Sequence, residues 1–247
     1  MRLGPPPKFT AIRQRARQAV SRALCLLLFT VPAAAQTIRP VLTEHGEKAR
    51  GKFELVNDTL EPLNVVLDAR SFTVSDSGEL SYRSLDKSIH LKLSTMSFRI
   101  PPQQNYWVFY EATADQNAAW FVIYASFTGY GFKTADGMNV RLQLPHTVYL
   151  LPKGKVQKQD LNLLRAEYDP GTQKVRVRLG NSSGQFGRCL AAEVSRGRKK
   201  ASLNGFPLFP KAERQVEIEW EDEELPDKIT LRFQNFTIEE KLQVVNR

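Results

Sequence analysis

The sequence is poor in the residues that build metal centres and nucleophilic sites. It contains two cysteines, Cys25 and Cys189, and three histidines, His45, His90 and His146. None of the histidines has a second histidine or a cysteine at the spacing of a zinc site. The sequence also lacks a glycine-rich phosphate loop, a GxSxG nucleophile motif and an HExxH motif. We therefore predict no catalytic residue, no metal and no cofactor.

Acidic residues are absent from the first 35 positions, which sets this segment apart. Six basic residues precede the nine-residue apolar run Ala23–Val31, and Pro32 and three alanines follow it. This order is typical of a secretory signal peptide, so we predict that residues 1–35 are one, cleaved after Ala35. Nine apolar residues are too few to span a membrane as a helix. The alternative is an N-terminal membrane anchor that is retained.

Removal of this segment changes what the charge and the thiols imply. The whole sequence has a formal net charge of +9, and loss of the six basic residues leaves +3. The excess of positive charge therefore belongs mostly to the signal peptide, and we predict no nucleic-acid partner. Cys189 would be the only remaining thiol, which excludes an intramolecular disulfide. Its position in the strand-like run Arg188–Val194 predicts a buried side chain that behaves as a small apolar group.

Helical periodicity is nearly absent after Gln36. Short strand-like runs recur between turn signals such as Asp76–Gly78 and Asn181–Gly184, a pattern typical of β-sandwiches. The segment Pro152–Lys155 has the composition of a linker and divides the runs into two sets. We therefore predict an all-β protein with two immunoglobulin-like β-sandwich domains, residues 36–152 and 153–247. Neither half has the Cys…Trp…Cys pattern of an antibody domain.

Individual runs predict where strands lie within the first sandwich. Tyr106–Ala112 and Trp120–Phe127 are apolar on both faces, and the second of these predicts a central strand. Thr37–Leu42 contains Pro40, which predicts an edge strand or a bulge because proline lacks the N–H that a central strand needs. The sequence also carries three N-glycosylation motifs, at Asn57, Asn181 and Asn235. The charged runs Arg196–Lys200 and Glu217–Glu224 are typical of solvated turns and faces.

The longest alternating stretch is Gly137–Pro152. Four apolar side chains share one face of this strand: Met138, Val140, Leu142 and Leu144. Arg141 and Gln143 occupy the opposite face, which is the period-2 pattern of a half-buried strand. A long strand of this kind can complete the sheet of its own domain or a sheet of another protein. The pattern alone leaves both interpretations open.

Several segments together resemble the periplasmic chaperones of pilus and fimbria assembly, the PapD-like superfamily. Gly46 lies eleven residues before Asn57. Phe98–Pro102 and the following strand are similar to the family's arginine–apolar–x–proline segment. Trp120–Ser126 is similar to its aromatic-rich central strand, and Tyr149–Pro152 to the end of its closing strand. The resemblance covers the mature protein as an architecture and is most specific over residues 37–152.

The resemblance implies a binding function without catalysis. Chaperones of this family donate alternating apolar residues of their closing strand to pilus subunits that lack a strand. Here the donor residues would be Met138, Val140 and Leu142, with Leu144 as a fourth. The implied partners are a pilus or fimbrial subunit and an outer-membrane usher, the implied location is the periplasm, and no stable membrane span is expected.

The sequence departs from the family at the residues that hold the terminal carboxylate of the subunit. The family uses an arginine on the first strand and a lysine near the end of the closing strand. Val41 and Thr147 occupy these positions here. We predict Arg39 as the substitute cation, with Thr147 at the second position and His146 or Arg141 as further candidates.

The sequence leaves two other interpretations open. In the first, the protein is a secreted immunoglobulin-like binding or structural protein, and the apolar stripe packs into its own core. In the second, it is a secreted enzyme, for which the sequence offers no site.

Overall fold

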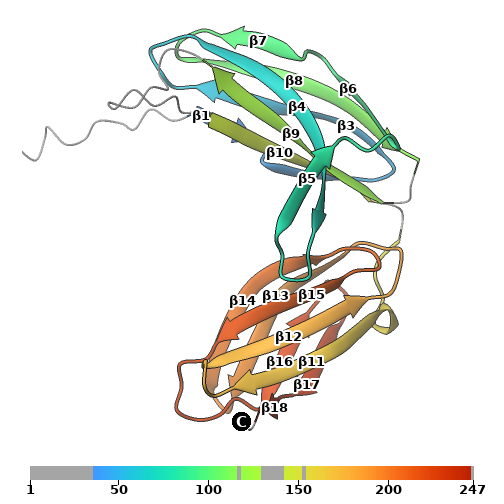
Figure 1. Cartoon of the computed structure of the whole chain (residues 1–247), viewed down its shortest axis with the longest axis vertical. Coiled ribbons are helices and arrows are strands. Elements are labelled where there is room, and N and C mark those ends of the chain that lie inside the picture. Colours follow the sequence, from blue (N-terminus) through green and yellow to red (C-terminus); the bar gives the residue numbers. More distant parts are fainter. Residues whose placement is uncertain (1–35, 116–117, 129–141, 152–153, 246–247) are drawn as a thin grey trace, which may run out of the picture. The chain divides into compact units, whose positions relative to one another are not determined.

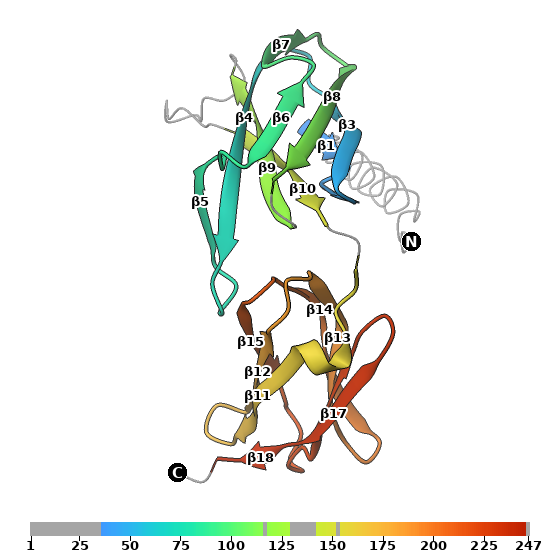
Figure 2. The ribbon, with the colours of Figure 1, turned by 90° about the vertical axis from the view of Figure 1, so that its right-hand side faces the viewer.

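The computed structural model describes residues 36–115, 118–128, 142–151 and 154–245. Nearly all regular structure in these residues is β-strand, arranged as two sandwiches of two sheets each (Figures 1 and 2). The predicted all-β fold with two sandwiches is therefore confirmed. The predicted signal peptide and the predicted domain boundary at 152–153 lie outside the described residues. Within those residues no helix is long and apolar enough to span a membrane.

The first sandwich contains strands β1 to β10. One sheet has the order β1 (Gln36–Arg39), β3 (Lys48–Asn57), β8 (Gln104–Ala114) and β6 (Ile89–Leu93). The other has the order β2 (Leu42–His45), β10 (Leu142–Leu150), β9 (Ala119–Thr128), β4 (Leu63–Val74) and β5 (Leu80–Ser84), and β7 (Ser97–Ile100) also pairs with β4.

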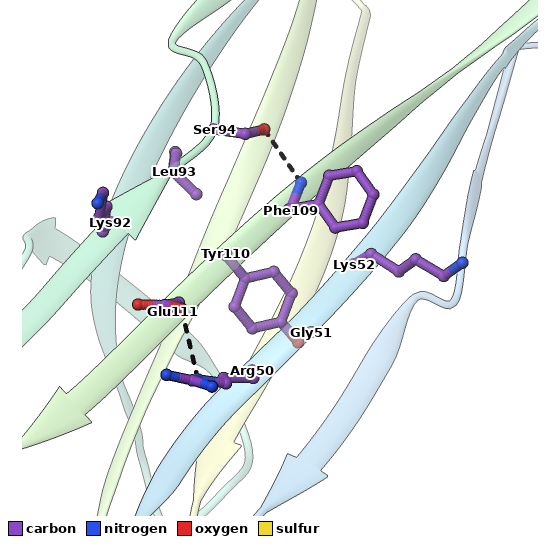
Figure 3. A pocket seen from close by; sticks show the side chains of 9 residues that line it. All are labelled: Arg50, Gly51, Lys52, Lys92, Leu93, Ser94, Phe109, Tyr110 and Glu111. Atoms are coloured by element: carbon purple, nitrogen blue, oxygen red, sulfur yellow. Dashed lines mark hydrogen bonds and ion pairs between the residues drawn. The ribbon is translucent and has the colours of Figure 1, made fainter.

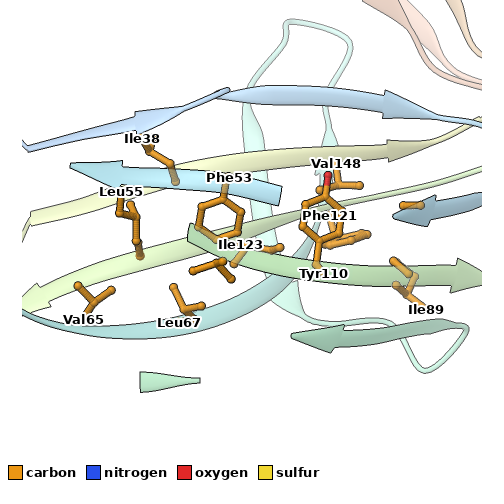
Figure 4. Close-up of a cluster of buried hydrophobic side chains, with 14 of the residues drawn as sticks. Ile38, Phe53, Leu55, Val65, Leu67, Ile89, Tyr110, Phe121, Ile123 and Val148 are labelled. Atoms are coloured by element: carbon orange, nitrogen blue, oxygen red, sulfur yellow. The ribbon is translucent and has the colours of Figure 1, made fainter. Parts of the chain in front are cut away.

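Alternation along the strands builds the core between these two sheets. On β3, Phe53 and Leu55 are fully buried, whereas the intervening Glu54 faces outward. Leu67 of β4 and Ile123 of β9 meet them from the other sheet (Figure 4). Because successive side chains of a strand point to opposite faces, every second residue enters this core. Burial of each large apolar side chain contributes about 1.5–3 kcal/mol to folding.

The two strands that are apolar on both faces differ in their environment. Strand β9 lies between β10 and β4 and is buried along most of its length, as the prediction of a central strand requires. Strand β8 lies between β3 and β6, but its outer face leaves Trp107 40% and Phe109 55% exposed. Both strands are central in their sheets, so an apolar outer face does not by itself signal burial.

The second sandwich contains the remaining strands. One sheet has the order β15 (Glu213–Glu219), β12 (Lys174–Asn181), β11 (Leu161–Asp169) and β18 (Gln243–Val244). The other has the order β14 (Lys199–Leu208), β13 (Gly187–Arg196), β16 (Lys228–Arg232) and β17 (Thr237–Lys241), and the short 3-10 turn η2 (Lys158–Asp160) precedes β11. Cys189 is fully buried on β13, as predicted, and burial raises its pKa to about 11.

Two of the three glycosylation motifs are structural. The Asn57 amide is fully buried and donates to the carbonyls of Glu61, Ile100 and Pro101 at 2.8–3.3 Å, while its carbonyl accepts from Thr59. In the second sandwich the Asn181 amide likewise donates to three main-chain carbonyls. Each asparagine thereby closes the loop after its strand by donating to the main-chain carbonyls of that loop. Only the third motif, at Asn235, has an exposed asparagine.

We predict that Asn57→Ala lowers the free energy of unfolding by about 2–3 kcal/mol, because the buried amide that donates to the Glu61, Ile100 and Pro101 carbonyls is lost. Urea unfolding followed by fluorescence measures this change. Asn235→Ala is the matched control and should change the stability by less than about 0.5 kcal/mol, since its side chain is exposed. Equal effects of the two substitutions would contradict a structural role for Asn57.

Candidate functional site

The first described segment contributes a strand to each sheet of the first sandwich. Strand β1 pairs antiparallel with β3, and β2 pairs parallel with β10. The backbone changes sheets at Pro40 and Val41, which belong to neither strand. The run Thr37–Leu42, predicted as one edge strand or a bulge, is therefore interrupted, because proline cannot continue the ladder.

This change of sheets leaves one edge of β10 partly open. On one side, β10 pairs with β9 along its whole length, Leu142–Leu150. On the other side, β2 pairs with it only over Thr147–Leu150. Within the described residues no strand pairs with the second edge between Leu142 and His146. An unpaired strand edge presents main-chain donors and acceptors that can bind an additional strand.

The predicted donor stripe lies only partly within the described residues. Leu142 and Leu144 are half-buried and pack against the first core, on the same face as the fully buried Val148. The other two residues of the stripe, Met138 and Val140, lie outside the described residues. The described half of the stripe thus continues the domain's own core toward the open edge.

His146 joins β10 to the point where the backbone changes sheets. Its side chain is fully buried, and its Nδ1–H donates to the Pro40 carbonyl at 2.7 Å. Because a carbonyl only accepts, Nδ1 carries the proton of the neutral ring, which leaves Nε2 as an acceptor. The described residues offer this Nε2 no donor, and the Phe53 ring stacks on the imidazole at a centroid distance of 4.6 Å. Burial is the main cause that lowers the His146 pKa to about 4.

A second hydrogen-bonded group packs beside His146. The Tyr110 hydroxyl lies 2.8 Å from Thr43 Oγ1 and 2.9 Å from His45 Nε2, so it links β8 of one sheet to β2 of the other. Gly51 allows this position, because any Cβ there would clash with the Tyr110 ring. Burial raises the pKa of Tyr110 and lowers that of His45, which keeps both side chains neutral.

The two residues predicted to hold a carboxylate lie near this junction but on different faces. Ile38 enters the core, so the next residue, the exposed Arg39, lies on the outer face of the first sheet, opposite Glu54 in register. Val148 enters the core, so Thr147 lies on the outer face of the second sheet. The structure therefore does not bring these two side chains together. His146 is buried and neutral, and so it presents no cation at the edge.

An exposed aromatic surface on the other sheet was not predicted as a site. Lys52 Nζ lies 4.2 Å from the centre of the Trp107 ring, a cation–π contact. Beside it, Phe109 borders a shallow hollow of about 520 Å³, where Arg50 pairs with Glu111 at 3.4 Å (Figure 3). Among the residues that the structure describes, no group of three potential metal ligands occurs here or elsewhere.

We predict that His146 makes the protein less stable in mild acid. The unfolded protein binds a proton at the ordinary histidine pKa of 6.5, whereas the folded protein does so only near pH 4. The free energy of unfolding should therefore fall by about 3 kcal/mol between these pH values because of this group. Urea unfolding at a series of pH values measures the slope.

His146→Asn keeps a donor near Pro40 and removes the titration, so its stability should depend less on pH over this range. The exposed His90 provides the control, because His90→Asn leaves His146 in place, so the contribution of His146 to the slope should persist. If His146→Asn and wild type show the same slope, His146 is not the buried neutral group inferred from the structure.

Comparison with known proteins shows the fold. No family model and no curated protein matches the sequence. Among solved structures, the class 5 fimbriae chaperone CfaA is similar with a TM-score of 0.57 at 8% identity, covering 84% of this chain and 99% of CfaA. The SafB chaperone of Salmonella enterica, solved with the SafA pilin, has a TM-score of 0.53 at 10% identity, with coverages of 86% and 99%. The YadV chaperone has a TM-score of 0.51 at 11% identity, with coverages of 83% and 98%. The protein therefore has the two-sandwich fold of the fimbrial chaperones, as the resemblance of its sequence predicts.

Proposed function

We propose that this protein is a periplasmic chaperone that binds pilus or fimbrial subunits by adding β10 to their unfinished sandwich. The observation that carries the proposal is the open edge of β10 between Leu142 and His146, within a fold shared with fimbrial chaperones. A binding function also agrees with a sequence that offers no catalytic motif. The predicted signal peptide supports the periplasmic location.

Strand addition provides both affinity and register. Main-chain groups of the open edge would pair with a strand of the subunit, and alternate apolar side chains would fill its hydrophobic groove. Each such side chain contributes about 1.5–3 kcal/mol when it becomes fully buried. Four residues, Met138, Val140, Leu142 and Leu144, would hold an otherwise exposed subunit core.

The half-buried state of Leu142 and Leu144 fits this role. Both side chains face the interior of their own sandwich but retain exposed surface at its rim. A partner sandwich that continues the sheet past β10 would cover that remaining surface. Additional burial would then come from side chains that are already held in position, so binding would cost little conformational entropy.

The implied partners follow from the proteins of similar structure. One of them was solved as a complex of the SafB chaperone with the SafA pilin, and another as a chaperone–tip adhesin complex. By this analogy of fold we propose a fibre subunit as the client. An outer-membrane usher is the second proposed partner, as the receiver of the client.

The competing function is that of a secreted immunoglobulin-like binding or structural protein. The packing of Leu142 and Leu144 against the first core favours it, because an alternating strand often serves only its own sandwich. The two functions differ in what a charge at Val140 does to the isolated protein.

We predict that Val140→Glu prevents recovery of the subunit, because a carboxylate cannot enter the subunit's apolar groove without a large desolvation cost. The protein is co-expressed with fimbrial subunits encoded beside its gene, and the soluble periplasmic complex is quantified after affinity purification. The thermal melt of isolated Val140→Glu should stay within a few degrees of wild type.

Leu164→Glu is the matched control, since Leu164 is 53% exposed on β11 of the second sandwich. This variant should recover the subunit as wild type does. Unchanged recovery with Val140→Glu would overturn strand donation through the stripe. Unfolding of isolated Val140→Glu would support the competing function.

A further inference from the structure

The direction of the main-chain groups along β10 can be read from its pairing. The Thr147 N–H donates to the Val41 carbonyl at 2.7 Å and the Leu151 N–H to the His45 carbonyl at 2.8 Å. Both groups therefore point away from β9, toward the side of β2. Alternate residues of a strand direct their main-chain N–H and C=O groups to the same edge. Because β10 pairs with β9 without a register shift, this alternation extends from Thr147 back to Gln143. The main-chain groups of Gln143 and Pro145 consequently face the open edge.

Pro145 removes a donor from this open edge. Proline has no N–H, and at an unpaired edge this costs the folded protein no hydrogen bond. The edge then offers the N–H of Gln143, while the next N–H, that of Thr147, is already bonded to Val41. Beyond Gln143, the described residues of β10 give an added strand no free donor on this edge.

The segment around Pro145 is held in place on both sides. The Gln143 amide donates to the Ser126 hydroxyl on β9 at 2.8 Å, and His146 donates to the Pro40 carbonyl. The first bond reaches β9, on the side of β10 away from the open edge, and the second reaches the segment between β1 and β2. A shift of β10 along β9 would break the first bond and move His146 out of its buried position.

We propose that Pro145 ends the ladder that β10 forms with an added strand and thereby fixes the register of the subunit. This role rests on the proposed function. It also supplies an alternative to the lysine that the resemblance implies at the position of Thr147, where that lysine would hold the terminal carboxylate of the subunit. Here the end of the subunit strand is set by the last available N–H, that of Gln143, instead of by a charged side chain. The same missing N–H limits pairing between two copies of this protein.

The inference is tested with Pro145→Val, which restores an N–H at the open edge and retains an apolar side chain suited to a strand. The free full-length protein is examined by sedimentation at a series of concentrations, which requires no subunit. Wild type should self-associate only weakly. Pro145→Val should self-associate about tenfold more tightly, since two symmetry-related N–H groups gain acceptors. Pro102→Val, at an exposed turn of the same sandwich, is the control and should behave as wild type.

The register itself is read from the complex with the co-expressed fimbrial subunit. Single cysteines are placed in turn along the subunit's terminal strand and tested for a disulfide with Leu144→Cys. One position should cross-link with Leu144→Cys alone, and the adjacent in-phase position, two residues along, should become reactive when Pro145→Val is added.

The outcomes of the two experiments separate the two proposals. Recovery of a complex with the same single register and no self-association of Pro145→Val would overturn the role of Pro145 and leave the chaperone function intact. Absence of any complex with wild type would overturn the chaperone function, and self-association of Pro145→Val would then still support Pro145 as the residue that ends the ladder.

Discussion

The first sandwich depends on how one short segment divides its main-chain hydrogen bonds between two sheets. Strand β1 completes the edge of one sheet beside β3, and β2 covers only the last part of β10 in the other. The segment that forms β1 and β2 is too short to pair with the full length of both β3 and β10. Part of the β10 edge is therefore left without a main-chain partner. The open part of β10 is thus a direct consequence of where the backbone changes sheets.

Buried polar side chains make this division possible. His146 holds the carbonyl of Pro40, where the backbone belongs to neither strand. Asn57 and Asn181 perform a comparable task, since each satisfies carbonyls in a loop that a sheet cannot pair. In all three cases the cost of burying a polar side chain is offset by its hydrogen bonds to main-chain carbonyls.

The open edge and the residues around it give the proposed chaperone function its physical content. The described half of the apolar stripe is positioned by its own core, yet it lies at a rim where a second sandwich would continue the sheet. Arg39 and Thr147 leave the sandwich on opposite faces, so these two residues do not form a paired anchor. In the proposed complex, the main-chain N–H groups on the open edge of β10 would then set the register of the subunit strand.

The sequence by itself determined the all-β fold, the two sandwiches, the inward faces of the strands and the buried Cys189. These features follow from period-2 alternation and turn residues, which are local properties of the polypeptide. Only the tertiary structure decided which edge of β10 is open, that His146 is buried and bonded to Pro40, and that Asn57 and Asn181 are structural. Those facts depend on partners that are distant in the sequence: His146 lies far along the sequence from Pro40, and pairing between strands is set by packing rather than by local pattern.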